Sequence, residues 1–94
     1  MRIVWTERAL INLEAIGAYL SERSPAASTR ILDAIGNGIE SLAEHPQRGR
    51  SGRVPQTREL VISRTRYVIA YRLVQEDVQV LAVIHGAQRW PKRF

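Results

Sequence analysis

Cysteine is absent from this sequence, and histidine occurs only twice. The chain therefore forms no disulfides, and we expect neither a metal site built from its side chains nor a bound cofactor. No apolar run approaches the ~20 residues that a membrane span needs, and the first residues, MRIVWTERAL, lack the apolar stretch of a signal peptide. We predict a cytoplasmic protein with no membrane partner, and the length allows one domain, residues 1–94.

Lysine is nearly absent as well, because thirteen of the fourteen basic residues are arginine. Arginine presents a planar fork of donors that suits phosphates and carboxylates. The charges are also divided along the chain: residues 1–44 have a net charge of −2, whereas residues 45–94 have a net charge of +7. A positive half in a small domain indicates an anionic partner, either nucleic acid or an acidic protein segment.

Two amphipathic helices are predicted in the first half of the chain. Thr6 has the position of an N-cap, and apolar residues recur at helical spacing from there to about Leu20. Ser24 and Pro25 then form a cap and a first helical residue, and the second stripe continues to about Glu44.

Two glycines lie inside the second predicted helix, and each costs ~1 kcal/mol relative to alanine. Gly38 is on the apolar stripe, which predicts a close approach of another element at that point. Gly36 is off the stripe and has no such reason.

Strand patterns dominate the second half. Arg2–Trp5 is a short candidate edge strand, residues 45–57 read as a loop, and three runs with strand composition follow it: Glu59–Ser63, Tyr67–Leu73 and Val78–Ile84. The short connections between these runs predict antiparallel hairpins. The last run is apolar on both faces, which predicts an interior strand with helices on one side and other material on the other. The expected fold is α+β, β-α-α-β-β-β in order, with a helical hairpin packed on a small antiparallel sheet.

The order of these elements, the loop HPQRGRSGR, the run TRELVISRTRYVIAYRL and the ending VLAVIHGAQRWP together resemble the RelE/ParE superfamily. These proteins are the toxins of bacterial type II toxin–antitoxin pairs. The resemblance implies a toxin that inhibits growth when free and that a cognate antitoxin neutralises in a hetero-oligomer. RelE-like members are ribosome-dependent nucleases that cut mRNA, whereas ParE-like members poison DNA gyrase.

The positions that match the catalytic residues of RelE-like nucleases depart from that pattern. Val68 stands where the resemblance implies a strand arginine, and Glu59 and Val61 stand at the two basic positions of the preceding strand. The late tyrosine of those nucleases has no counterpart in the ending WPKRF.

A second nuclease set remains open. Metal-free RNA cleavage requires a base, a cation for the phosphorane and an acid, and the candidates for these roles are Glu59, either Arg58 or Arg72, and His85. Glu59 is better suited to a structural ion pair with Arg58, Arg72 or another arginine, and His85 is equally suited to a structural hydrogen bond. If the chain is an enzyme, it is an endoribonuclease.

The ParE-like pattern fits the strand ends more closely. ParE-like members carry a Tyr-Arg pair at the end of the third strand and a Leu/Ile-His pair at the end of the fourth, which Tyr71-Arg72 and Ile84-His85 match. Gyrase poisoning requires a binding surface and no proton transfer by the toxin. We therefore favour gyrase as the target, with mRNA cleavage and a degenerate toxin that only binds antitoxin as alternatives.

The candidate residues for binding nucleic acid or another target are arginines of the basic half and one tryptophan: Arg48, Arg50, Arg53, Arg58, Arg64, Arg66, Arg72, Arg89 and Trp90. The first three lie in a glycine-containing loop that either is solvated or grips phosphates. Trp90 either stacks on a base or an antitoxin side chain, or packs on the sheet. The positive half is also a candidate antitoxin-docking surface, for which we expect an apolar patch rimmed with arginine beside the helical hairpin.

Overall fold

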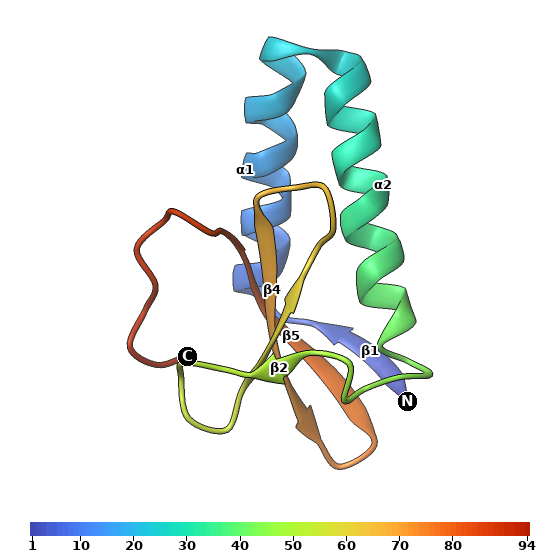
Figure 1. The fold of residues 1–94 in the computed structure, drawn as a ribbon, viewed down its shortest axis with the longest axis vertical. Coiled ribbons are helices and arrows are strands. Elements are labelled where there is room, and N and C mark those ends of the chain that lie inside the picture. Colours follow the sequence, from blue (N-terminus) through green and yellow to red (C-terminus); the bar gives the residue numbers. More distant parts are fainter.

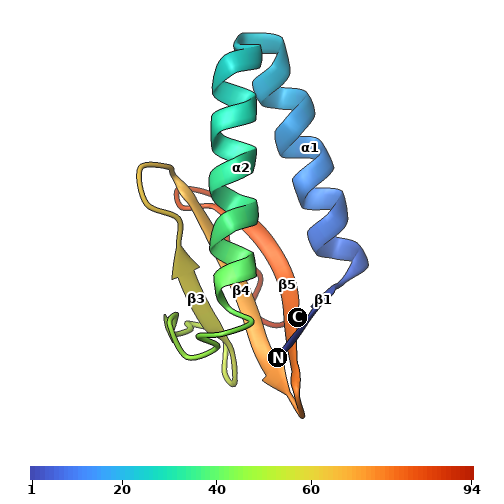
Figure 2. The ribbon, with the colours of Figure 1, turned by 90° about the vertical axis from the view of Figure 1, so that its right-hand side faces the viewer.

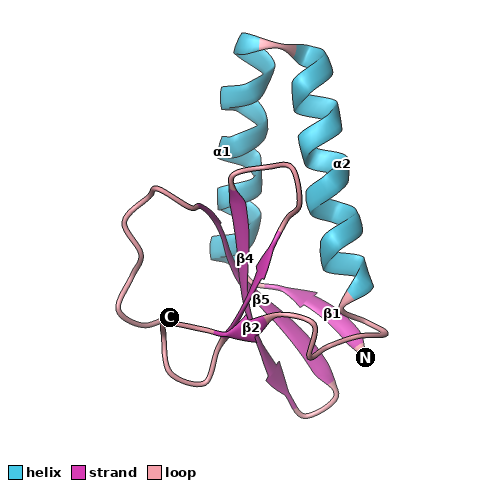
Figure 3. Ribbon diagram, in the orientation of Figure 1, coloured by secondary structure: helices cyan, strands magenta, loops and turns pink.

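The computed structural model describes residues 1–94 as two helices and a five-stranded sheet (Figure 1, Figure 3). In chain order the elements are β1 (Arg2–Trp5), α1 (Glu7–Arg23), α2 (Pro25–Ser41), β2 (Arg50–Ser51), β3 (Arg58–Val61), β4 (Tyr67–Val74) and β5 (Asp77–His85). The predicted α+β class, with a helical hairpin packed on a sheet, is confirmed. Neither helix is long and apolar enough to cross a membrane.

Both predicted helix caps are present. The Thr6 hydroxyl accepts a hydrogen bond from the amide of Ala9 at 3.2 Å and donates one to the carbonyl of Val80 in β5 at 2.8 Å, which fixes the start of α1 to the sheet. The Ser24 hydroxyl accepts from the amide of Ala27 in the same way. The helices are therefore joined by a single residue, and they stand antiparallel on one side of the sheet (Figure 2).

The sheet is mixed, with the order β1-β5-β4-β3-β2. β1 pairs with β5 in parallel, and the other pairs are antiparallel, so the expectation of an entirely antiparallel sheet was wrong for β1. A four-residue strand carries no sequence signal for the direction of its partner. The two-residue strand β2 lies within the segment predicted as loop, since it is too short to show alternation.

Apolar side chains cover both faces of the sheet. On the helix face, the large core includes Ile35 and Ile39 of α2 packed over Tyr71 and Val80. On the opposite face lies a smaller cluster of Ala70, Leu81, Ala82 and Ile84, which is covered by Trp90 and Phe94 of the last segment. We call residues 86–94 the tail and this surface the tail face. The sequence predicted that both faces of β5 are covered, and the tail covers the face opposite the helices.

The two helical glycines have different surroundings. A Cβ at Gly38 would lie 2.5 Å from Cδ1 of Ile62, so α2 packs closely against the residue that follows β3. A Cβ at Gly36 would meet no heavy atom within 4 Å. The predicted close approach at Gly38 is confirmed, and Gly36 has no packing reason within the chain.

Candidate functional site

Glu59 of β3 is the centre of a network with two arginines of the preceding loop. Its side chain is only 2% exposed. Nη2 of Arg50 lies 3.0 Å from Oε1, and Nε of Arg53 lies 3.1 Å from Oε2. The backbone amide of Arg53 also donates to Oε2 at 2.7 Å, and its Nη2 donates to Oε1 at 3.2 Å. Both carboxylate oxygens therefore have two donors each.

The network determines the ionisation of Glu59. Burial opposes the charged form and would raise the pKa of Glu59, but hydrogen bonds from the side chain and backbone of Arg53, and from Arg50, hold that pKa below its ordinary value. At neutral pH the carboxylate is ionised and its lone pairs are occupied. A group in this state is a weak proton acceptor and a strong anchor for the two arginines.

Arg72 and His85 lie far apart on the sheet. Arg72 pairs with Gln79 near one end of β4, and its Nε donates to the Gln79 side chain at 2.6 Å. His85 pairs with Tyr67 at the other end of β4. The five residues from Tyr67 to Arg72 correspond to about 16 Å at ~3.3 Å per residue.

The sheet also separates the three candidate catalytic residues between its faces. Glu59 lies opposite Ala70, a residue of the tail face, and Arg72 shares that face by alternation. His85 lies beside Tyr67, which belongs to the core on the helix face. The structure therefore does not bring Glu59, Arg72 and His85 together around one phosphate.

His85 has structural contacts at the start of the tail. Its ring packs edge-on against Tyr67, with ring centroids 5.5 Å apart and an interplanar angle of 86°. Nδ1 accepts a hydrogen bond from the amide of Ala87 at 3.1 Å, and the backbone amide donates to the Gln88 side chain at 3.3 Å. These bonds fix the turn that leads out of β5.

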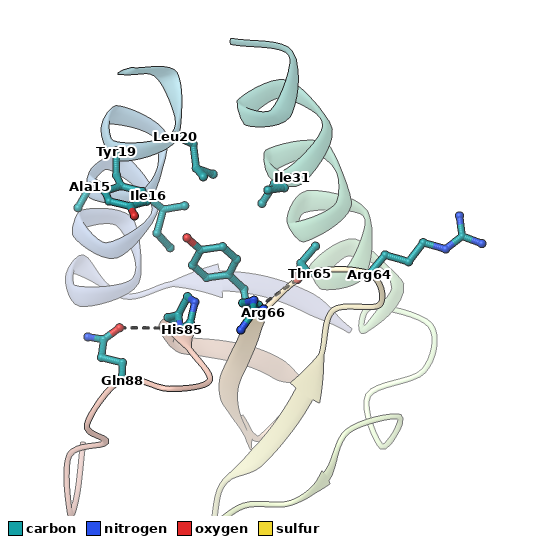
Figure 4. A pocket seen from close by; sticks show the side chains of 11 residues that line it. Ala15, Ile16, Tyr19, Leu20, Ile31, Arg64, Thr65, Arg66, His85 and Gln88 are labelled. Carbon is teal, nitrogen blue, oxygen red and sulfur yellow. Dashed lines mark hydrogen bonds between the residues drawn. The ribbon is translucent and has the colours of Figure 1, made fainter. Parts of the chain in front are cut away.

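An apolar cleft opens between the helical hairpin and the ends of the strands (Figure 4). Its volume is about 520 Å³, and it is lined by Ala15, Ile16, Tyr19, Leu20, Ile31, Arg64, Thr65, Arg66, Tyr67, His85 and Gln88. The helices provide the apolar wall, and the β3–β4 turn provides two arginines, of which Arg64 extends outward (Figure 4). The cleft has the composition expected of a partner groove.

Two tyrosines give this cleft polar groups. Tyr19 is 53% exposed on α1. Burial raises the pKa of Tyr67, with a smaller contribution from Tyr19, so the Tyr67 hydroxyl remains protonated at neutral pH.

The arginine loop is anchored to the sheet by Tyr71. The fully buried Tyr71 hydroxyl donates to the carbonyl of Pro46 at 2.7 Å and accepts from the amide of Gly49 at 2.9 Å. Nη1 of Arg58 donates to the Gly49 carbonyl at 2.8 Å. A Cβ at Gly49 would lie 2.6 Å from the tyrosine oxygen, so only glycine fits. The loop is therefore held in place, a role for Tyr71 that its motif position did not reveal.

Two arginines clamp the aromatic residues of the tail. The guanidinium of Arg53 lies 3.7 Å from the centroid of the Trp90 ring, and that of Arg8 lies 5.2 Å from the centroid of Phe94. Trp90 packs on the sheet, and its buried Nε1 has no hydrogen-bond partner. Arg8 and Phe94 were not among the predicted site residues, because neither lies in a periodic pattern or a motif.

The remaining candidate arginines are free of carboxylates. Arg50 and Arg53 pair with Glu59, and the other six form no ion pair: Arg48, Arg58, Arg64, Arg66, Arg72 and Arg89. No group of three or more histidine, aspartate or glutamate side chains is placed to hold a metal ion. The arrangement offers cationic binding surfaces and an apolar cleft.

Comparison with known proteins places these features in a family. A sequence model described as "ParE toxin of type II toxin-antitoxin system, parDE" matches residues 3–90. The chain is 46% identical over 91 residues to Y4kP of Sinorhizobium fredii, covering 97% of this chain and 94% of that one. It is 38% identical over 87 residues to "Toxin RelE2" of Caulobacter vibrioides, covering 93% and 97%. A solved chain of "Chromosomal ParDE TA system from P. aeruginosa" superposes with a TM-score of 0.79 at 24% identity, over 90% of this chain and 95% of that chain.

Proposed function

Since this chain belongs to the ParE toxin family of type II toxin–antitoxin systems, we propose that it inhibits bacterial growth by poisoning DNA gyrase. It is a toxin whose partner is an antitoxin. The ParE-like pattern, with Tyr71-Arg72 in the second half of β4 and Ile84-His85 at the end of β5, supports gyrase as the target.

The observation that carries the proposal is the separation of Glu59, Arg72 and His85. Both carboxylate oxygens of Glu59 are hydrogen-bonded to arginines on the tail face, and His85, the last residue of β5, lies on the helix face opposite Tyr67. Acid–base cleavage of RNA requires these groups around one phosphate. Binding to a gyrase–DNA complex requires only a complementary surface.

The antitoxin is proposed to dock in the apolar cleft. A flexible segment that folds on binding gains its affinity from burying apolar side chains. The cleft offers Ile16, Leu20 and Ile31 for that purpose, and the rim arginines Arg64 and Arg66 suit an acidic segment.

A second candidate function is ribosome-dependent cleavage of mRNA. It is supported by the names of three relatives from Caulobacter vibrioides that are 32–38% identical to this chain, RelE1, RelE2 and RelE3. The resemblance to RelE-like nucleases implies this activity. It would require a catalytic set other than the one separated by the sheet.

The deciding experiment combines purified gyrase with pulse labelling. The chain should convert supercoiled plasmid to linear DNA when gyrase is present and leave it unchanged when gyrase is omitted. In cells, thymidine incorporation should fall within minutes of induction while leucine incorporation persists. An earlier fall in leucine incorporation, without gyrase-dependent cleavage, would favour mRNA cleavage instead.

The variant His85→Ala separates the same two functions. If the chain poisons gyrase, plasmid linearisation and the block in thymidine incorporation should be within twofold of the unmodified chain, since the His85 ring packs on Tyr67 and its Nδ1 accepts a hydrogen bond from the tail turn. Loss of toxicity from a folded His85→Ala variant that still binds antitoxin would point to catalysis by this residue.

A further inference from the structure

The tail face carries many basic residues and one buried acidic residue, Glu59. Between residues 45 and 75, Glu59 is the only acidic residue, and no acidic residue follows Asp77. The basic residues on or beside this face are contributed by α1, β2, β4, the β2–β3 loop and the tail: Arg8, Arg50, Arg53, Arg72, Arg89, Lys92 and Arg93.

Arg50 and Arg53 are the basic residues of this surface that form ion pairs. Both bind the same buried carboxylate, so their charges exceed its charge by one. Arg50 uses Nη2, and Arg53 uses Nε and Nη2, which leaves Nη1 of each guanidinium without a protein acceptor. The two side chains are 58% and 47% exposed. Their unused donors are therefore accessible to solvent, while the buried carboxylate of Glu59 fixes the positions of both guanidinium groups.

Trp90 adds a second constraint on Arg53. Its ring lies against the guanidinium at 3.7 Å, so the plane of the fork is set by the tail as well as by Glu59. A fork held by a carboxylate on one side and an aromatic ring on another loses little conformational freedom when it binds an anion.

We propose that Arg50 and Arg53 are a preorganised phosphate-binding pair that contacts the backbone of duplex DNA. Arginine forks match phosphate oxygens in a bidentate manner. Arg72 and the basic residues of the tail extend the positive field beyond the pair, as a polymer of phosphates requires. The inference rests on the proposed function, in which the target is a complex of gyrase with DNA.

The shape of the surface favours a polyanion over an acidic peptide. None of the five main cavities is lined by Arg50, Arg53 or Trp90, whereas the apolar cleft lies on the helix face. A peptide that folds on binding gains its affinity from apolar burial in a groove, and none of these cavities borders the arginine pair. The phosphate backbone of DNA can bind to exposed cationic side chains without a groove.

The test is the salt dependence of binding to a labelled 20-base-pair duplex of arbitrary sequence, measured by fluorescence anisotropy with the whole chain. Each phosphate contact contributes a slope of ~0.9 in log affinity against log salt. The double variant R50Q/R53Q should therefore lower the slope by about 1.8. The matched control R23Q/R30Q removes the same charge from exposed positions of the helices and should leave the slope unchanged. The proposal would be overturned if the unmodified chain and R50Q/R53Q had equal slopes. It would also be overturned if R50Q/R53Q and the control R23Q/R30Q lowered the slope by the same amount.

A second variant and a second readout guard against misfolding. R50Q/R53Q leaves Glu59 buried without its partners, so R50Q/R53Q/E59Q removes the carboxylate charge as well and should show the same reduced slope with a cooperative thermal transition. In a Trp5→Phe background, Trp90 is the only tryptophan. DNA bound by Arg53 should change its emission, and saturating DNA without any change would count against the pair.

The same proteins in the plasmid assay separate this inference from the proposed function. If the unmodified chain binds DNA through the pair but does not linearise plasmid with gyrase, the proposed function fails and the phosphate pair stands. If it linearises plasmid while R50Q/R53Q/E59Q binds DNA as well as the unmodified chain does, only the phosphate pair fails. Binding of a poly-glutamate peptide, but not DNA, through these arginines would overturn the assignment to DNA.

Discussion

At the scale of single residues, the structure decides between the two roles that the sequence allows for Glu59. From the sequence it is a candidate base or a partner in a structural ion pair, and the structure confirms the ion pair: Glu59 is a buried anion with four hydrogen bonds from two arginines. The hydrogen bonds that occupy the lone pairs of Glu59 also fix the positions of the two arginines, whose side chains remain about half exposed to solvent.

The acid sensitivity of the fold should depend on Glu59. Its pKa is lowered in the folded chain, so its stabilising contribution is present above the pKa of the unfolded chain and is lost as pH falls through the folded pKa. We expect the midpoint temperature of thermal unfolding to decrease as the pH is lowered below about 4.3, the ordinary pKa of glutamate. Glu59→Gln should make this decrease at acid pH, the acid limb of the curve, less steep, and should lower the midpoint temperature at pH 7. Calorimetry against pH measures both.

Asp77 provides the control for this prediction. Its pKa is also lowered, by the side-chain hydrogen bond from Arg2, but the pair is exposed to solvent. Asp77→Asn should therefore alter the acid limb less than Glu59→Gln. An acid limb unchanged by Glu59→Gln would contradict the assigned network.

The Tyr71 hydroxyl should contribute to stability through the loop it anchors. Tyr71→Phe leaves the amide of Gly49 without its acceptor in a buried position and should lower the free energy of unfolding by ~1–3 kcal/mol. Tyr67→Phe is the matched control, because the Tyr67 hydroxyl makes no hydrogen bond within the chain, and its effect should lie within ~0.5 kcal/mol. Urea unfolding measures both, and equal effects would exclude the anchoring role.

At the scale of elements, the helices were the most predictable part of the chain. Thr6 and Ser24 cap them as expected, because a capping side chain acts within three residues of its own position. The partner of β1 and the contact of Arg53 with Trp90 depend on residues far apart in the chain, and no local pattern encodes them. The strand β2 has only two residues, which is too short for an alternating pattern. The arginines of the candidate site were therefore predicted by residue type, and an ion pair of Glu59 with an arginine was expected, but its partners Arg50 and Arg53 were not identified.

The two glycines of α2 should respond in opposite ways to a side chain. Gly36 faces open space, so Gly36→Ala should raise the free energy of unfolding by ~1 kcal/mol through helix propensity. Gly38→Leu should lower it by ~1–3 kcal/mol, because the new side chain meets Ile62 in a packed region. Thermal unfolding measures the signs, and destabilisation by Gly36→Ala would show that this position is constrained.

At the scale of the whole molecule, the sheet separates two candidate surfaces. The apolar cleft lies with the helices on one side, and the tail face carries the arginine pair on the other. Antitoxin docking and DNA contact are thus proposed at different places on the same small fold.

Antitoxin affinity should depend on the cleft side of α1. Tyr19→Ala removes an aromatic side chain that lines the cleft and should weaken binding of the cognate antitoxin at least tenfold, or ~1.4 kcal/mol. Ile11→Ala is the matched control, since Ile11 is exposed on the same helix but does not line the cleft. Calorimetric titration gives both affinities, and equal losses would place the docking surface elsewhere.

The division of charge along the chain has a consequence for encounter. Residues 1–44, net −2, form β1 and the helical hairpin, and residues 45–94, net +7, form the rest of the sheet and the tail (Figure 1). The molecule is therefore an electric dipole, and the field of a polyanion turns it so that the sheet leads and the hairpin trails before any contact forms. Ionic strength should then act mainly on the rate of association, as for other electrostatically steered pairs.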